Sequence, residues 1–166
     1  MLNNRVEWLP ALVLLEDYRG DAEKYIKVIY KIFRQEFIEN PPNYKNQRVG
    51  ITKQPFYDGK EAGFWHLIQE GKVEIDRLPD IRRFERIKWP RAIIINERDI
   101  RIKVWENKRG NKKFICLWIE CADYLLVLAK RKGYVLLWTG YPITYPNRKN
   151  DLQKEYEEYT KANAAV

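Results

Sequence analysis

Residues 113–140, KFICLWIECADYLLVLAKRKGYVLLWTG, decide the fold, because they hold three nearly continuous apolar runs separated by short polar breaks. The runs at 113–120, 123–130 and 133–140 have the length of strands, and such runs are typical of strands in a sheet that helices cover on at least one face. The Lys-Gly pair at 132–133 indicates a tight turn between the last two runs. The stretch therefore predicts consecutive antiparallel strands.

Two earlier segments are also predicted to be strands. AIIIN at 92–96 is short and β-branched, and IRIKVWEN at 100–107 alternates between apolar and polar residues. This alternation puts Ile100, Ile102 and Val104 on one face and Arg101, Lys103 and Trp105 on the other. A connection with glycine at 109–112 predicts a hairpin into the next strand, and Gly140-Tyr141-Pro142 ends the sheet.

Helical patterns flank this sheet. Asp21 is predicted to cap a helix from about residue 22 to 39, and a last helix at about 148–161 turns Leu152, Tyr156 and Tyr159 inward. Before the first helix, residues 9–15 fit either a buried strand or an extended arm. After it comes the basic loop 41–60, in which residues 48–53 form at best a short strand, and a loop of this length is more often functional or mobile than filler.

The predicted fold class is α+β: N-terminal helices, then an antiparallel sheet of about four to five strands, then a C-terminal helix. A chain of 166 residues is expected to form a single domain. Its parts are an N-terminal helical segment (1–45), a basic loop with two helices (46–91), the sheet (92–143) and the C-terminal helix (144–166).

The composition is strongly basic. Lys and Arg number 31 against 23 Asp and Glu, a net charge of +8, which favours polyanionic partners such as nucleic acid. Cys116 and Cys121 suggest neither a zinc site nor a disulfide framework, and are expected to be buried free thiols. Without a signal-peptide pattern or an apolar run near the ~20 residues of a membrane span, we expect a cytoplasmic protein with no membrane partner.

The stretch with the most chemical potential is 59–91, GKEAGFWHLIQEGKVEIDRLPDIRRFERIKWPR, which contains the single histidine. A helix is predicted from about residue 61 to 70, with Gly71 as its C-terminal cap. On this helix Phe64, Leu67 and Ile68 share one face, and His66 lies nearly opposite. The imidazole is therefore expected to point away from the core.

A second helix is predicted to start at Pro79-Asp80 and to stop at Pro90. Its inward and outward faces separate by residue type. The apolar residues expected to face the core are Ile81, Phe84 and Ile87, and the arginines on the other side are Arg82, Arg83 and Arg86. Arg77 and Arg91 complete an arginine cluster around the histidine.

Four segments together resemble phage-associated nucleases of the barnase/EndoU/colicin/RelE-like superfamily. They are FWHLI (64–68), RLPDIRRFERIKWPRAII (77–94), DYLLVLAKRKGYVLLWTGYPI (123–143) and KEYEEY (154–159), and the similarity spans most of residues 50–160. The resemblance implies helices followed by a four-stranded antiparallel sheet, RNA cleavage without a metal, and for several members a role as toxins in inter-bacterial or phage conflict. It draws attention to His66, to the arginines near Arg86, and to Thr139 and Tyr141. Gly140 stands where a small residue such as alanine is expected, a difference expected to be harmless.

Metal-free RNA cleavage needs a proton acceptor, a proton donor and cations around the phosphate. Histidine, whose ordinary pKa is near 6.5, suits proton transfer, and arginine forks suit phosphate oxygens. We therefore predict two groups of site residues. The catalytic group is His66, Arg86, Glu85 and Thr139, and the substrate-binding group is Lys60, Arg82, Arg83, Tyr141 and Trp65.

Each of these residues also has a plainer interpretation. His66 is equally a surface or packing residue, RRFER a solvated helix face with ion pairs, Glu85 an ion-pair partner of the arginines, and Trp65 a packing residue. Other enzyme classes lack their signals: no phosphate-binding glycine loop or Ser/His/Asp order is present, and one histidine excludes a multi-histidine metal site. No metal or other cofactor is predicted.

The sequence thus predicts a metal-independent, toxin-like endoribonuclease that cuts RNA by 2′-hydroxyl transesterification. Its expected partners are tRNA, mRNA or ribosome-bound RNA, and a cognate inhibitor protein is a further candidate partner. The alternative is a catalytically inactive nuclease-fold protein that binds RNA or serves as one partner of a toxin–antitoxin pair. A purely structural phage protein is a third hypothesis.

Overall fold

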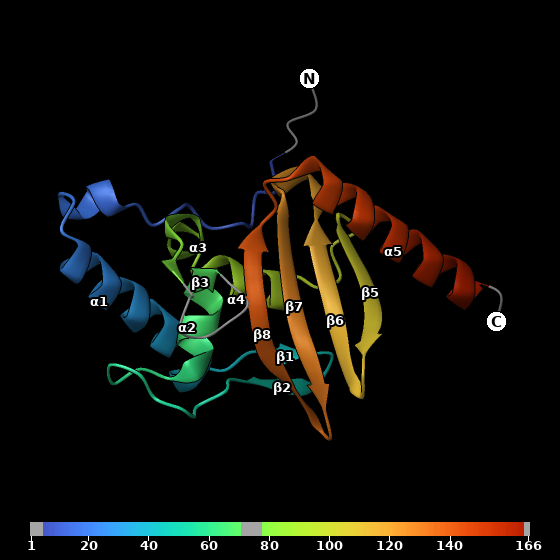
Figure 1. Cartoon of the computed structure of the whole chain (residues 1–166), viewed down its shortest axis with the longest axis horizontal. Coiled ribbons are helices and arrows are strands. Elements are labelled where there is room, and N and C mark those ends of the chain that lie inside the picture. The colour runs from blue at the N-terminus through green and yellow to red at the C-terminus, as the bar shows by residue number, and fades with distance from the viewer. Residues whose placement is uncertain (1–4, 71–77, 165–166) are drawn as a thin grey trace.

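The computed structural model describes residues 5–70 and 78–164. It is an α+β structure in which a group of helices packs on one face of a six-stranded sheet and a long C-terminal helix crosses part of the other face (Figure 1). We call the first face the back and the second the front. No helix in the described part of the chain is both long enough and apolar enough to cross a membrane.

The main sheet has the strand order β1-β2-β8-β7-β6-β5. Its strands are β1 (Asn43–Tyr44), β2 (Gln47–Gly50), β5 (Ile102–Arg109), β6 (Lys112–Ile119), β7 (Tyr124–Arg131) and β8 (Tyr134–Pro142). A small second sheet pairs β3 (Gln69–Glu70) with β4 (Leu78–Pro79). The α-helices are α1 (Ala22–Phe33), α2 (Ala62–Ile68), α3 (Ile81–Glu85), α4 (Trp89–Ile95) and α5 (Pro146–Ala164).

The three apolar runs form strands as predicted. They become β6, β7 and β8, joined antiparallel, with Gly133 at a φ of 83° in the last turn. The hairpin between β5 and β6 and the C-terminal helix are also confirmed, and Leu152 of α5 is fully buried. The first helix starts at the Asp21 cap and continues beyond α1 as a π-helix, Arg34–Glu39.

The sheet differs from the prediction in size and direction, since six strands replace four to five and one pair is parallel. β1 and β2 form a hairpin whose turn residues Lys45 and Asn46 have φ values of 45° and 66°. β2 then pairs in parallel with β8 at Val135 and Leu136. The turn contains no glycine, and the partner strand lies far away in sequence, so local patterns indicate neither feature.

The predicted strand at 92–96 is wrong, because this segment belongs to α4. Pro90 opens α4 in its first turn instead of stopping the preceding helix. Ala92, Ile93 and Ile94 are all buried, and a short apolar run that is buried all round does not distinguish a helix from a strand. Residues 9–15 provide an extended arm that hydrogen-bonds other elements, through Val13 N to Glu85 O at 2.9 Å for example.

Several smaller predictions need correction. Pro79 belongs to β4, and α3 begins after Asp80, whose carboxylate accepts a hydrogen bond from Arg82 N at 2.9 Å. Ile81 is 44% exposed and Ile100 is 98% exposed, because neither lies under another element. Cys116 is buried as expected, but Cys121 is exposed. Gly71 and Arg77 lie outside the described residues.

Two apolar clusters occupy the two faces of the sheet. On the back, side chains of α1, α2 and α4 pack against Leu117, Leu126 and Leu137. On the front, α5 covers Trp105, Trp118 and Leu125 with Leu152. The predicted alternation of β5 side chains between the two faces of the sheet is confirmed, with Ile102 on the back and Trp105 on the front. α5 covers only part of the front, and no other helix or strand of the described residues lies over the rest of that face (Figure 1).

Candidate functional site

The site is built around an irregularity in β8. Val127 of β7 pairs with Thr139, but the next residue, Leu128, pairs with Leu137, so Trp138 is an extra residue in β8. Such β-bulges redirect side chains and are frequent beside active sites. Here the bulge lets Trp138 and Thr139 line the same hollow on the open front face.

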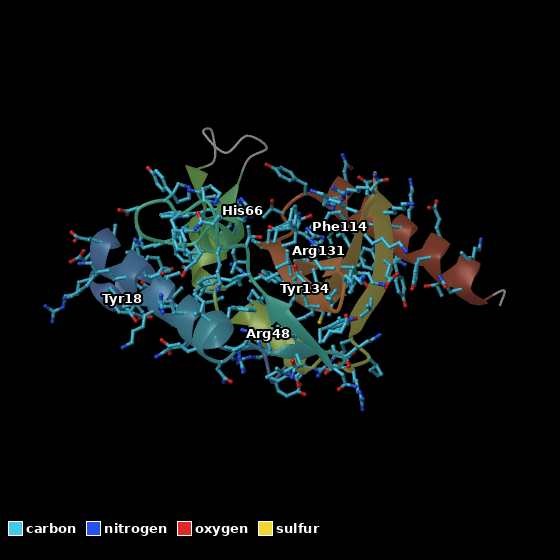
Figure 2. The ribbon with its side chains drawn as sticks, turned by 90° about the horizontal axis from the view of Figure 1, so that it is seen from below. Tyr18, Arg48, His66, Phe114, Arg131 and Tyr134 are labelled. Carbon is cyan, nitrogen blue, oxygen red and sulfur yellow. The ribbon has the colours of Figure 1, made fainter. Side chains whose placement is uncertain are left out.

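His66 reaches this bulge from α2. Phe64, Leu67 and Ile68 are buried as predicted, and the half-buried His66 ring lies 6.5 Å from the Trp138 ring, centroid to centroid. The side of α2 that carries His66, predicted to point away from the core, therefore faces β8. Figure 2 shows His66 on the same side of the ribbon as Phe114 and Arg131.

Trp138 is also the centre of a basic and aromatic cluster. Its ring centroid is 5.5 Å from that of Phe114, 5.5 Å from Lys112 Nζ and 5.9 Å from Arg131 Cζ. A cation within about 6 Å of an indole is attracted to the ring. The cluster therefore combines two tilted aromatic rings with two positive charges, beside an imidazole.

Arg83 approaches the neighbouring part of β8 from α3. Its Nη1 donates to Gln69 O at 2.8 Å and reaches Thr139 Oγ1 at 3.5 Å, while its Cζ lies 5.3 Å from the Tyr141 ring centroid. The Arg83 side chain is only 11% exposed, so its position is fixed by packing. Thr139 and Tyr141 lie on one side of the strand, as their spacing predicted.

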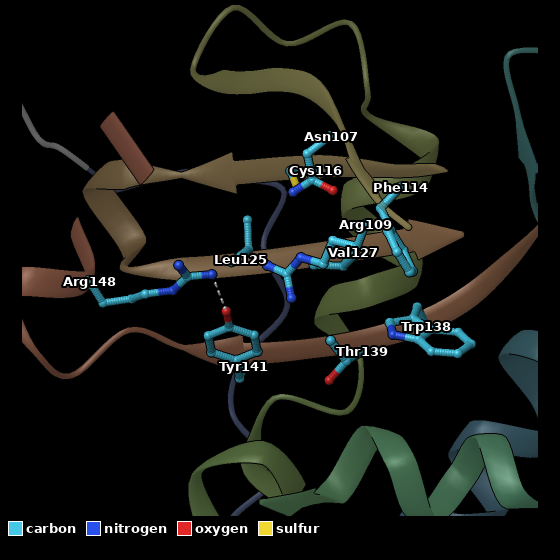
Figure 3. A pocket seen from close by; sticks show the side chains of 10 residues that line it. All are labelled: Asn107, Arg109, Phe114, Cys116, Leu125, Val127, Trp138, Thr139, Tyr141 and Arg148. Carbon is cyan, nitrogen blue, oxygen red and sulfur yellow. Dashed lines mark hydrogen bonds between the residues drawn. The ribbon is translucent and has the colours of Figure 1, made fainter. Parts of the chain in front are cut away.

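Arg148, in the first turn of α5, holds Tyr141 from the other direction. Its Nη2 donates to Tyr141 Oη at 3.0 Å (Figure 3). Burial lowers the pKa of Arg148, but the bond to Tyr141 and the nearby Glu155 outweigh it, so this pKa lies above its ordinary value. Arg148 is therefore a fixed cation at the front of the sheet.

A second hollow of about 240 Å³ lies between α3, the end of β8 and the start of α5. Arg82, Arg83, Tyr141 and Arg148 are part of its wall, with Asp80. Asp80 caps α3 and also accepts bonds from Arg82 Nε and Nη2, both at 3.2 Å. Because its wall contains three guanidiniums and one carboxylate, this arginine-lined hollow is positively charged.

The structure places two of the predicted catalytic residues elsewhere. Arg86 lies against Trp89, with Cζ 5.1 Å from the ring centroid, and its Nη1 donates to Arg82 O at 3.0 Å. Glu85 lines a shallow hollow beside Arg19 and the N-terminal arm. The charged side chains of α3 therefore point in different directions: those of Arg82 and Arg83 point toward β8, and that of Glu85 does not.

Lys60, in the turn before α2, and Trp65, in α2 itself, form a separate group. Trp65 Nε1 donates to Tyr57 O at 2.9 Å, and Lys60 Nζ lies 5.8 Å from the Trp65 ring centroid. Lys60 also donates to Asp58 O at 3.2 Å. These contacts give both residues packing partners within that turn, away from the bulge.

Sequence reasoning missed several residues of the site. Asn107 and Arg109 follow Trp105 at intervals of two, so continuing the alternation of β5 would have placed them on the front face. Trp138 and Arg148 gave no comparable signal, since a bulge and the docking of α5 depend on distant residues. These four and Phe114 line the front hollow with Thr139 and Tyr141.

Comparisons of the chain with protein-family models, with curated proteins and with solved structures find no match. Within residues 5–70 and 78–164, no three or more His, Cys, Asp or Glu side chains gather as a metal site would require. The group along β8 offers proton transfer at an imidazole, anion binding at arginines and ring stacking.

Proposed function

We propose that the protein binds RNA along β8 and cleaves it by attack of the ribose 2′-hydroxyl on the adjacent phosphate. The observation that carries this proposal is the gathering of His66, Trp138, Thr139 and Arg83 from two helices and one bulged strand. The imidazole lies beside the tryptophan ring, and the guanidinium reaches the neighbouring threonine.

In this reaction the 2′-oxygen forms a bond to phosphorus and the bond from phosphorus to the 5′-oxygen breaks. The products are a 2′,3′-cyclic phosphate and a free 5′-hydroxyl. Since Glu85 faces another surface, we assign both proton transfers to His66: it accepts the 2′-hydroxyl proton and returns it to the leaving 5′-oxygen. The imidazole ends the cycle in the form in which it began.

The arginines supply the charge stabilisation. Fixed cations aimed at the phosphate lower the barrier because charge grows on its oxygens in the transition state. Arg83 is held beside Thr139 and Arg148 is held on Tyr141, so both are positioned in advance. Arg82 is more exposed, with 45% of its side chain accessible, and is suited to bind the next phosphate of the RNA strand.

A second candidate function is RNA binding without cleavage, as one partner of a toxin–antitoxin pair or as an RNA-binding factor. The cluster of Trp138, Phe114, Lys112 and Arg131 favours it, because stacking and charge bind single strands without any need for His66. Both candidates require the same surface and differ in the role of the imidazole.

The test is cleavage of total tRNA in the presence of a chelator by wild type and by His66→Ala. We expect wild type to give fragments ending in 2′,3′-cyclic phosphate, and His66→Ala to be slower by about 10²- to 10⁴-fold, the usual contribution of a general acid–base residue. Arg98→Ala is the control, because the Arg98 side chain is 96% exposed in the turn before β5.

Equal rates for wild type and His66→Ala would remove the histidine from the mechanism. If neither protein cuts RNA but both bind it with a strong salt dependence, the binding function replaces the enzyme. A preparation with no salt-sensitive affinity for polynucleotides would contradict both candidates.

A further inference from the structure

The front hollow is a small pocket with a defined volume. It measures about 160 Å³, and Figure 3 shows the side chains that line it. Strands β5, β6, β7 and β8 each contribute to its wall, and Arg148 closes one end. Its walls are therefore mostly strand residues, which hold their positions better than loop residues.

The size and walls of the pocket suit one flat ring. An apolar cavity of about 150 Å³ accepts a benzene-sized molecule, so a volume of 160 Å³ has room for one planar heterocycle. The rings of Phe114 and Trp138 lie 5.5 Å apart at 56° and form one apolar side. Leu125 and Val127 form part of the floor. Aromatic and apolar walls of this kind hold nucleobases by stacking.

Asn107 gives the pocket a polar group. Its Nδ2 donates to Cys116 Sγ at 3.6 Å, and within the described residues its buried Oδ1 accepts no hydrogen bond. Burial raises the pKa of the Cys116 thiol to about 12, so the sulfur is uncharged. Buried polar atoms in folded proteins almost always have a partner, and a bound ligand is one source of it.

The pocket adjoins the proposed cleavage site. Trp138 lines the pocket, with its ring 6.5 Å from that of His66, and Tyr141 lies between the pocket and the arginine-lined hollow, since it lines both. Arg148 borders both hollows. A nucleotide whose base enters the pocket therefore has its phosphate within reach of the fixed cations.

We propose that this pocket is a nucleobase subsite that selects bases with an exocyclic amino group. The proposal rests on the proposed function in so far as RNA is the ligand. The base stacks on one of the two tilted rings of Phe114 and Trp138 and meets the other with its edge, and its amino group donates to Asn107 Oδ1. A base with a carbonyl at that position, such as uracil, places two acceptors face to face, and a buried acceptor without a donor strongly disfavours binding.

The test is calorimetric titration with pairs of nucleotides that differ only in this group. 2′-Deoxycytidine 3′-monophosphate is compared with 2′-deoxyuridine 3′-monophosphate, and the 2′-deoxyadenosine compound with the 2′-deoxyinosine compound. We expect at least one amino-bearing nucleotide to bind about ten-fold or more tightly than its carbonyl partner, the usual discrimination by a good base contact. These probes lack the 2′-hydroxyl, so the titration does not depend on cleavage.

Two substitutions assign the preference to Asn107. Asn107→Leu removes the acceptor and is expected to abolish the preference, whereas Asn107→Asp keeps an acceptor oxygen and is expected to retain it. Asn150→Leu, at an exposed position of α5, is the matched control and should bind as wild type does. Thermal unfolding of each variant checks that it is folded.

The outcomes separate the subsite from the enzyme. Preferential binding by a protein that never cuts RNA supports the subsite and overturns the ribonuclease. RNA cleavage by a protein that binds all four probes equally, or binds none of them, overturns the subsite and leaves the ribonuclease in place. A preference that survives in Asn107→Leu also overturns it.

Discussion

Gly140 of β8 illustrates how tightly the back of the sheet is packed at the site. A Cβ atom built on Gly140 would overlap the hydroxyl of Tyr124, and it would approach Tyr124 Cζ to 3.2 Å. Tyr124 is itself fixed, because it is fully buried and its ring meets that of Trp89 edge-on at 5.3 Å. Glycine is therefore required here by packing, and is not the neutral replacement for alanine that the sequence suggested.

We predict that Gly140→Ala lowers the free energy of unfolding by about 1–3 kcal/mol, the usual cost of overpacking a core. In a Tyr124→Phe background the added methyl no longer meets a hydroxyl, so the same substitution should cost clearly less. Urea denaturation of the four proteins measures the coupling. An equal loss in both backgrounds would show that the overlap with the hydroxyl is not the cause.

Glu36 in the π-helix gives a prediction about pH. Burial raises its pKa to about 7, although Arg91 and Lys88 act in the opposite direction. The unfolded carboxyl ionises near 4.5, so between pH 4.5 and 7 the unfolded chain releases a proton that the folded chain keeps. By linkage, this group makes the protein less stable as the pH rises through that interval.

Glu36→Gln should therefore stabilise the protein at pH 8 and have little effect near pH 4.5. At 1.36 kcal/mol per pKa unit the full shift corresponds to about 3 kcal/mol, and partial exposure reduces the expected gain to about 1–2 kcal/mol. Thermal unfolding at the two pH values measures it. The exposed Glu39 of the same helix provides the control Glu39→Gln, and an equal gain there at pH 8 would assign the effect to net charge.

At the level of elements, the sequence predicted what short-range patterns determine. Length and continuous apolarity were enough for β6, β7 and β8, and the spacing of Phe64, Leu67 and Ile68 was enough to turn His66 out of the core. The same reasoning failed at residues 92–96, because a short run of buried isoleucines suits a helix and a strand equally. It also missed the pairing of β2 with β8, which no local pattern encodes.

The residues of the candidate site were likewise predictable only where short-range patterns determine their positions. The predicted residues that the structure brings together at β8 are those on helix faces or at regular strand spacing: His66, Arg83, Thr139 and Tyr141. Arg86 and Glu85 lie elsewhere: α3 ends at Glu85, so Arg86 follows the helix and packs on Trp89, while Glu85 faces the N-terminal arm. Trp138 and Arg148 depend on the bulge and on the docking of α5, which are tertiary features.

The short helix α3 yields a prediction of its own, because Asp80 has two roles there. It caps the helix at Arg82 N, and its carboxylate partly neutralises the guanidinium of Arg82, with two bonds of 3.2 Å. Asparagine caps helices about as well as aspartate, whereas alanine does not. The two substitutions therefore separate the structural role from the electrostatic one.

We predict that Asp80→Asn unfolds nearly as wild type does and binds single-stranded RNA several-fold more tightly, because one negative charge leaves the arginine-lined hollow. Asp80→Ala should bind more tightly as well, but lose about 1 kcal/mol of stability with the cap. Denaturation and fluorescence anisotropy with a labelled oligonucleotide give the two readouts. Unchanged or weaker RNA binding by Asp80→Asn would show that this hollow does not hold phosphate.

At the scale of the whole molecule, the net charge of +8 matters less than where the cations lie. The helices α1 to α3 lie toward one end of the molecule, α4 passes behind the sheet and α5 extends from the other end, so that an opening on the front face lies beside α5 (Figure 1). Cations from five different elements border that opening or the bulge: Arg83, Arg109, Lys112, Arg131 and Arg148. A single strand crossing the open face would therefore contact several of them at once.

This arrangement predicts a localised electrostatic footprint. For single strands, the slope of log affinity against log salt changes by about 0.7 for each phosphate contact. Removing two cations beside Trp138, in Lys112→Ala/Arg131→Ala, should make the slope shallower by about 1.4. The matched control is Lys24→Ala/Lys27→Ala, which removes the same charge from the exposed outer face of α1 and should leave the slope unchanged. Anisotropy titrations with the oligonucleotide between 50 and 200 mM salt measure both slopes, because phosphate contacts weaken strongly over this range. Equal changes in the two double variants would mean that RNA is attracted by the total charge, and β8 would then not be its binding surface.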